Sequence, residues 1–281
     1  MQDRRFTNSG DFNYAPNDDE MMTGYFGEYI LVNGAYNPYK EVKAGWSRLR
    51  IINGSNARVY NLAFSNEQEF AVIGSDAGLL AAPETVKNIL LSPGERIDML
   101  ADFSNAANKE IFLQSKTFDG GGVQGKAAFK ILKFKVGEKT NEIFTLPASL
   151  SVITKINPSS ATKTRTFDIS NASMHDGGHK MDMMDKEDTT VETREDLVKQ
   201  GRKKMQMKMG MHTINGVSYD ANKINETVQA GATEIWEFDN SKGDEIHPMH
   251  FHGEHFQVLE RTGGRGKLIA SEKGWKDTVM L

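Results

Sequence analysis

The chain contains no cysteine, so neither a disulfide nor a thiolate metal ligand can come from its 281 residues. For the same reason, the compartment in which the protein works cannot be inferred from cysteine usage. No run is long and apolar enough to span a membrane. The opening residues Met1–Phe6 are followed by a polar stretch, so no signal peptide is visible.

A strongly basic charge balance is also lacking. Lys and Arg number 34 against 38 Asp and Glu, which gives a net charge of −4, and no long basic run occurs. A nucleic-acid-binding surface is therefore not indicated. The length is sufficient for two domains of ordinary size, each with a buried core.

Short apolar runs separated by turn residues fill the first half of the chain. The alternation is clearest over Ile97–Phe103, where every second residue is apolar. Between Ile131 and Leu132 the apolar phase shifts, which predicts a β-bulge. The expected strands are Glu28–Val32, Trp46–Ile52, Tyr60–Phe64, Phe70–Val72, Ile97–Phe103 and Phe129–Val136. Strands of this length and spacing predict an all-β sandwich or barrel.

The second half of the chain shows the same pattern of short apolar runs, after a stretch with the composition of a linker. Residues 145–162 are rich in Pro and Ser, as interdomain linkers are. Further strands are predicted at Thr166–Ile169, Thr213–Gly216, Thr233–Phe238, Phe256–Leu259 and Trp275–Leu281. The pairs Asn33-Gly34 and Asn215-Gly216 each follow an apolar run, which is weak evidence for two copies of one fold.

Three histidines lie close together in His247–Gly253, which reads His-Pro-Met-His-Phe-His-Gly. In an extended strand, side chains alternate between the two faces, so His250 and His252 should point one way and Met249 the other. His247 is an odd number of residues from His250, and a proline lies between them. Neutral imidazole is a common ligand of copper and zinc. The stretch therefore predicts a metal site divided over two faces; the alternative is a solvated strand end or hydrogen-bonded core histidines.

A methionine-rich insertion lies between the predicted strands of the second half. Residues 174–211 hold eight of the chain's 14 methionines, set among Lys, Asp, Gln and Gly rather than Leu and Ile. Thioethers suit Cu(I), and carboxylates tolerate Cu(II), so copper handling is the favoured interpretation. The alternative is that these methionines fill gaps in a core. Within the insertion, Thr190–Lys204 is compatible with a charged, exposed helix.

These motifs together resemble the multicopper oxidase family. The stretch His247–Gly253, with the Phe256–Leu259 run after it, looks like the copper motif of that family's third domain. Gly274–Val279 resembles the strand that precedes the family's final His-Cys-His motif. The segments Gln2–Phe6, Leu31–Gly34, Arg50–Ser55, Ile73–Leu80 and Leu91–Arg96 are similar to its second domain. The insertion is similar to that of bacterial copper-efflux (cuprous) oxidases and laccase-like enzymes.

The resemblance implies a domain organisation. Residues 1–147 would be the second cupredoxin-like Greek-key domain, with 1–22 as a connector arm. Residues 148–162 would be a linker, and 163–281 the third domain, incomplete at its C-terminus and carrying the 174–211 insertion. The family's first domain and its His-Cys-His segment have no counterpart in these residues, so the chain is expected to be part of a longer enzyme and inactive by itself.

The resemblance also implies a chemistry. The family couples one-electron oxidations to the four-electron reduction of O2 to water, using type 1, type 2 and type 3 copper. His247 matches the type 1 ligand, His250 the type 2 ligand and His252 a type 3 ligand. Asp244 and Asp277 are candidates for orienting an imidazole, or are solvated turn aspartates. A substrate copper would lie on Met181, Asp182, Met183, Met184 and Asp185.

Alternatives in substrate and in class remain. Glu245 stands where copper-efflux oxidases have methionine, which leaves a laccase-like phenol oxidase beside the Cu(I) oxidase. A non-catalytic copper-binding or structural cupredoxin protein is the alternative of another class. The family implies a periplasmic or secreted protein, monomeric when complete, with O2 and Cu(I) or a phenol as its small-molecule partners.

Overall fold

The computed structural model describes residues 1–171, 212–243 and 245–281. The predicted helix at Thr190–Lys204 and the candidates Met181 to Asp185 lie outside these residues, as does Asp244. The chain divides into two compact units, one formed by residues 1–16, 24–156 and 245–281 and the other by residues 17–23 and 157–244. No helix among the described residues has the length and apolar character needed to cross a membrane.

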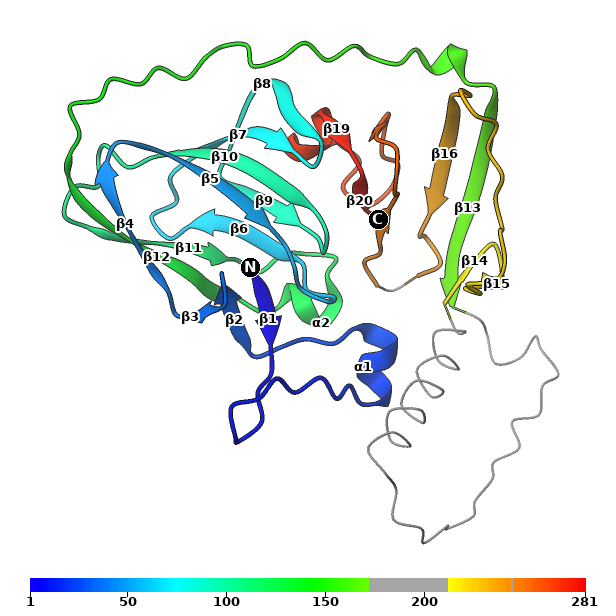
Figure 1. The fold of residues 1–281 in the computed structure, drawn as a ribbon, viewed down its shortest axis with the longest axis horizontal. Helices are drawn as coiled ribbons and strands as arrows, with labels where there is room; N and C mark the ends of the chain where they lie inside the picture. The colour runs from blue at the N-terminus through cyan, green and yellow to red at the C-terminus, as the bar shows by residue number, and fades with distance from the viewer. Residues whose placement is uncertain (172–211, 244) are drawn as a thin grey trace, which may run out of the picture. The chain divides into compact units, whose positions relative to one another are not determined.

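The first unit is built on two sheets whose strands are mostly antiparallel (Figure 1). One has the strand order β5-β10-β7-β8, from Trp46–Ile52, Arg96–Asp102, Phe70–Ser75 and Gly78–Val86. The other has the order β4-β12-β11-β6-β9, from Tyr39–Ala44, Phe129–Lys139, Glu110–Ser115, Tyr60–Phe64 and Asn88–Leu91. A smaller sheet joins β1 (Gln2–Arg4), β2 (Tyr29–Val32) and β3 (Ala35–Tyr36), and a short helix, α2, spans Gly122–Gly125.

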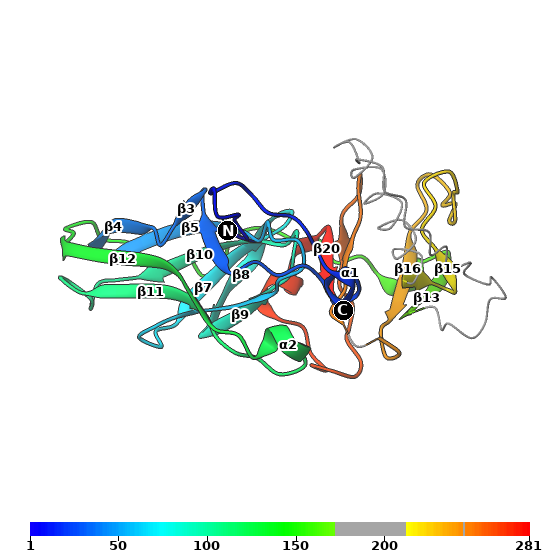
Figure 2. The same ribbon diagram turned by 90° about the horizontal axis from the view of Figure 1, so that it is seen from below.

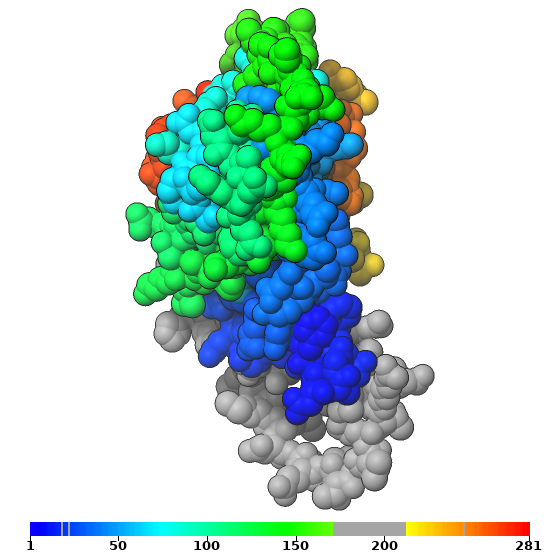
Figure 3. Space-filling model, turned by 90° about the vertical axis from the view of Figure 1, so that its left-hand side faces the viewer, coloured from blue at the N-terminus to red at the C-terminus, as the bar shows by residue number. Residues whose placement is uncertain are grey.

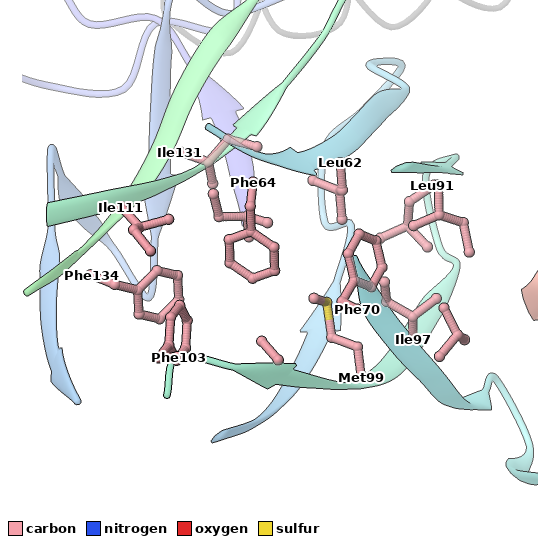
Figure 4. Packing of buried hydrophobic residues seen from close by; sticks show 14 of the residues in the cluster. Leu62, Phe64, Phe70, Leu91, Ile97, Met99, Phe103, Ile111, Ile131 and Phe134 are labelled. Carbon is pink, nitrogen blue, oxygen red and sulfur yellow. The ribbon is translucent and has the colours of Figure 1, made fainter. Parts of the chain in front are cut away.

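The two large sheets lie against one another (Figure 2), and apolar side chains from both meet in one core (Figure 4). Phe64 of β6 and Phe134 of β12 are fully buried, as is Met99 of β10 on the facing sheet. The alternation predicted for Ile97–Phe103 is confirmed, since Ile97 is 2% exposed and Phe103 0%. In Figure 3, blue atoms from the region of β4 lie beside green atoms from the region of β12, the strand with which β4 pairs.

Local sequence signals account for the strand ends. The Asn33-Gly34 pair has positive φ angles of 50° and 81°, which is the conformation of a tight hairpin turn between β2 and β3. Asn215 and Gly216 repeat it with 53° and 73°. The predicted bulge is confirmed: β11 pairs with Leu132 and then Lys130, which leaves Ile131 as the extra residue.

The second unit contains a four-stranded sheet of order β15-β14-β13-β16. Its strands are Val217–Ser218, His212–Ile214, Lys163–Asn171 and Glu234–Asp239, and β13 and β16 are parallel. Arg165 joins these two strands through hydrogen bonds to Glu234, and Phe167 stacks on Phe238 with ring centroids 5.0 Å apart. The unit also holds α1 (Asp18–Thr23) and the 3-10 helix η1 (Pro158–Ser160).

Residues 245–281 consist of very short elements within the first unit. β17 (Pro248–His250) pairs with β20 (Thr278–Met280), and β18 (Phe256–Gln257) pairs with β19 (Trp275–Lys276). The 3-10 helix η2 (Ala270–Lys273) lies against β7 and β8, and its Ala270 joins the sandwich core.

Several predicted segments differ from the structure in extent, and two of them change the description of the fold. The strand predicted at Phe256–Leu259 ends at Gln257, and the side chain of Leu259 is 47% exposed. The connector arm expected over residues 1–22 contributes the strand β1, whose Asp3 is buried and paired with Arg58. The chain is thus an all-β protein, as the alternating pattern predicted.

Candidate metal centre

β17 and the turn after it present the predicted histidine stretch. The backbone carbonyl of His247 accepts a hydrogen bond from Leu281 N at 2.9 Å, and His250 pairs with Thr278 of β20. The stretch ends at Gly253, whose φ of +88° suits glycine and turns the chain away.

The structure brings the imidazoles of His250 and His252 together. Their ring centroids are 4.8 Å apart, and the rings meet edge to face. Phe251, between them, contacts Phe256 instead, with ring centroids 5.4 Å apart. This separation of neighbours agrees with the alternation argued from the sequence. The His250 side chain is 45% exposed, which leaves the ring accessible.

Hydrogen bonds assign the tautomer of His250. Its Nδ1 lies 3.0 Å from the carbonyl oxygen of Asp277 and 3.0 Å from Oγ1 of Thr278. A carbonyl oxygen only accepts, so Nδ1 must carry the hydrogen. The Thr278 hydroxyl donates its own hydrogen to Oδ1 of Asp277 at 2.8 Å, which leaves Oγ1 as a second acceptor. The lone pair of the neutral ring is therefore on Nε2.

Asp277 is held as a carboxylate by Arg96. Arg96 donates two hydrogen bonds of 2.6 Å, one to each carboxylate oxygen. These bonds, together with those from Thr278 and the positive charge of Arg96, outweigh partial burial and lower the pKa of Asp277 to about 2. Of the two aspartates considered for orienting an imidazole, Asp277 thus touches His250: its backbone carbonyl lies 3.0 Å from Nδ1, and its carboxylate oxygen Oδ1 lies 3.6 Å from the same atom.

A buried cluster of charged side chains lies next to the Arg96–Asp277 ion pair. The ammonium of Lys276 is 2.9 Å from Asp76 and 2.8 Å from Glu95, and all three side chains are 0% exposed. Burial alone would lower the pKa of Lys276, but the charges of Glu95 and Asp76 and their hydrogen bonds outweigh it and raise the pKa. Asp76 also accepts from the backbone N–H of Thr278 at 3.2 Å. The cluster therefore fixes the strand on which His250 is anchored.

The residues that hold the strand next to His250 were not predicted from the sequence. Arg96, Asp76, Glu95 and Lys276 lie inside the quoted family motifs, but their contacts span up to 202 positions of the chain. The one sign of these contacts in the sequence was that acidic and basic residues stand next to apolar strand positions in these motifs. No three His, Asp or Glu side chains in the described part of the chain are placed to hold a single metal ion.

Each of the two imidazoles is a donor of the kind that copper takes. Metal-binding histidines commonly donate one ring N–H to a carbonyl or carboxylate, which fixes the ring and exposes the other nitrogen. His250 has this arrangement, with Nδ1 anchored and Nε2 carrying the lone pair. His252 supplies a second imidazole beside it.

Comparisons with known proteins give the family. Two multicopper oxidase family models match, over residues 14–132 and 186–281. The chain is 30% identical over its whole length to the cell division protein FtsP of Photorhabdus laumondii, and 33% identical over 85% of its length to the multicopper oxidase LPR1 of Arabidopsis thaliana. It spans 51% of the former protein and 36% of the latter.

Solved structures agree with these matches. The multicopper oxidase McoA of Aquifex aeolicus is 33% identical, with a TM-score of 0.76; all of this chain and 55% of that one are covered. The laccase-like oxidase CueO of Ochrobactrum sp. is 27% identical, also with a TM-score of 0.76, covering all of this chain and 56% of that one. The chain belongs to the multicopper oxidase family.

Proposed function

We propose that the chain forms part of an oxidase that couples one-electron oxidation of a substrate to the four-electron reduction of O2 to water. The observation that carries this proposal is the His250–His252 pair, in which one ring is anchored through Nδ1 so that Nε2 is free to bind copper. Family membership supports the same chemistry.

The histidines have separate roles in this proposal. His247 is a ligand of the type 1 copper that accepts electrons, His250 of the type 2 copper and His252 of a type 3 copper. When bound, the copper ions supply the one-electron steps that join substrate oxidation to O2 reduction. This assignment rests on the family motif and on the alternation of the strand, and the rest of each ligand set would come from outside the described residues.

The residues around His250 keep it in a binding-competent form. Asp277 and Thr278 accept Nδ1–H, which holds the ring plane and leaves Nε2 without a proton. Arg96 keeps Asp277 ionised, so the Thr278 hydroxyl is committed to the carboxylate. These groups need no rearrangement when a metal ion arrives, which lowers the cost of assembling the site.

The substrate is proposed to be Cu(I), bound by Met and Asp side chains of the 174–211 insertion, with a phenol as the alternative. Oxidation of a phenol with and without added copper, by the intact protein and by a 174–211 deletion, separates the two. Activity that requires copper and falls on deletion supports a bound substrate copper. Activity that is copper-independent and unchanged supports a laccase-like enzyme.

A non-catalytic copper-binding or structural role is the second candidate. The observation in its favour is the match, at 30% identity over the whole chain, to proteins named for cell division rather than oxidation. We further propose that the protein acts in the periplasm or is secreted, and that it is monomeric when complete.

Oxygen uptake by the copper-loaded protein that carries this chain tests the main proposal. We expect uptake with Cu(I) or a phenol, its loss in His250→Ala, and retention in His255→Ala, an exposed neighbour outside the assigned set. Copper-loaded protein that binds the metal through His250 but consumes no O2 supports the non-catalytic candidate.

A further inference from the structure

A cavity opens at the edge of one sandwich sheet. Its lining residues come from β4, the edge strand of that sheet, and from β12, which runs parallel beside it. The cavity has a volume of about 370 Å³, within the range of roughly 300–1,000 Å³ that small-molecule sites occupy. We call it the Gly137 notch; it is lined by Glu41, Val42, Lys43, Lys135, Val136 and Gly137.

A bulge and a glycine together create this notch. Val136 pairs with Val42, and Lys139 pairs with Ala44, so β12 carries one extra residue between the two pairs. Gly137 follows directly and is exposed. A Cβ at this position would meet only the carbonyl oxygen of Val42, at 3.6 Å. The sheet therefore has room for a side chain that the sequence does not supply. Bulges of this kind are common beside functional sites.

Three charged side chains surround the notch. Lys43, Lys135 and Glu41 are exposed, and none of them forms an ion pair in the described part of the chain. The ammonium of Lys135 lies 3.7 Å from the centroid of the Tyr39 ring, which restrains the side chain without neutralising its charge. The notch thus presents two ammonium groups and one carboxylate to a ligand.

The pattern of these charges indicates the class of ligand. An ammonium is a compact point charge with three donors, and it pairs strongly with a carboxylate oxygen. A ligand with two carboxylates can therefore use both Lys43 and Lys135. A ligand that carries only negative charge is repelled by Glu41, whereas one with an additional ammonium group gains a third pair there. Two carboxylates and one ammonium are the charges of an acidic amino acid.

We propose that the Gly137 notch binds a free acidic amino acid such as glutamate. Its carboxylates lie on Lys43 and Lys135, its ammonium on Glu41, and its carbon chain fills the space over Gly137. This site is independent of copper and of the histidines, since none of its lining residues belongs to 245–281.

Titration of the chain with sodium L-glutamate, followed by backbone amide chemical shifts, tests the proposal. The ionic strength is held constant, because exposed charges are screened by salt. We expect saturable shifts centred on residues 41–43 and 135–138. Each exposed pair contributes little, so the Kd should be on the order of 1 mM or weaker. Shifts that rise linearly without saturation would overturn the proposal.

Filling the notch tests its shape separately from its charge. Gly137→Val should abolish saturable binding, because its side chain takes the space of the ligand. Gly137 does not adopt a positive φ, so a side chain brings no backbone strain. If the valine variant fails to fold, Gly137→Ala carries the test, since its Cβ makes only an ordinary contact. It should weaken binding several-fold. Unchanged binding in every folded Gly137 variant would contradict the assignment.

Charge removal has a matched control. Lys135→Gln should weaken glutamate binding about 5-fold, the effect of losing one exposed ion pair. Lys116→Gln removes an exposed lysine that pairs with Glu67 outside the notch, and it should leave the Kd unchanged. Equal weakening in both variants would show that only the overall charge of the protein matters, and would overturn the site.

Glutarate decides whether the ligand's ammonium is recognised. It has the two carboxylates of glutamate, at the same spacing, and lacks the ammonium. We expect sodium glutarate to bind the wild type about 3- to 5-fold more weakly than glutamate, and the difference to vanish in Glu41→Gln. Equal affinity of the wild type for both compounds would overturn the assignment of an amino acid.

Discussion

The sandwich and the segment 245–281 belong to one compact unit but are stabilised differently. The sandwich depends on apolar side chains such as Leu62 and Phe64, both 0% exposed. The segment has strands of only two or three residues and relies on buried charges, with Lys276 and Glu272 also fully enclosed. Apolar burial is non-directional and tolerates repacking, whereas ion pairs demand a fixed geometry. The segment that presents the histidines is thus held by the more directional interactions.

Removal of Lys276 should produce the largest loss. Lys276→Met leaves the carboxylate of Glu95 buried without a cation and that of Asp76 with only Arg96, 3.7 Å away, which costs about 3–5 kcal/mol. Denaturant unfolding measures the loss. The control is Lys116→Met, which breaks the exposed pair with Glu67 and should cost no more than about 1 kcal/mol. Similar losses in both variants would contradict the account of the cluster.

A cavity introduced into the sandwich core by mutation tests the apolar half of this comparison. Leu62→Ala should destabilise by about 2–5 kcal/mol, because a fully buried side chain is removed. It should leave the His250 ring tautomer as in the wild type, whereas Lys276→Met should disturb it. Unfolding curves and histidine ring spectra of the same samples give both results. A tautomer change in the folded Leu62→Ala protein would show that apolar packing also orients the histidine.

The buried Glu272 gives the segment a dependence on pH. Burial would raise the pKa of Glu272, but hydrogen bonds from Arg261 and the charges of Arg261 and Arg265 outweigh it and lower the pKa below the ordinary 4.5. A lowered folded pKa contributes stability that is complete above about pH 4.5 and is lost as the pH falls through the folded value. We expect Glu272→Gln to cost about 1–3 kcal/mol at neutral pH.

That cost should shrink on acidification, since the wild type then loses its own carboxylate. Unfolding of the two proteins across the acidic range checks the sign. A difference that grows as the pH falls would contradict the assigned direction of the pKa shift.

The smallest effect is expected at Thr278. Thr278→Val removes one of the two acceptors of His250 Nδ1 and keeps the carbonyl of Asp277. It should cost about 1–2 kcal/mol, because the hydrogen bond that the hydroxyl donates to Oδ1 of Asp277 is lost as well. The Nδ1–H tautomer should persist in ring spectra, because the remaining partner can only accept. A complete change of tautomer would show that the hydroxyl, rather than the carbonyl, sets the ring.

The fold was accessible from sequence because its signals are local. Alternation over Ile97–Phe103, the two Asn-Gly turns and the bulge at Ile131 each depend on a few neighbouring residues. The adjacency of His250 and His252 followed in the same way, from the period of a strand. The copper types assigned to the histidines, and the limits of the two domains, stay predictions.

The support of the site could not be predicted, because it depends on distant partners. Lys276 is charged and would ordinarily be expected at the surface. Only the fold reveals that Asp76 and Glu95 enclose it. Arg96 likewise resembles any strand residue until its fork is seen on Asp277.

Electron paramagnetic resonance of the chain titrated with Cu(II) tests the central claim, that His250 and His252 are copper ligands. The account predicts imidazole nitrogen couplings that are lost or reduced in His250→Ala and His252→Ala and preserved in His255→Ala. Identical spectra for all four proteins would contradict it.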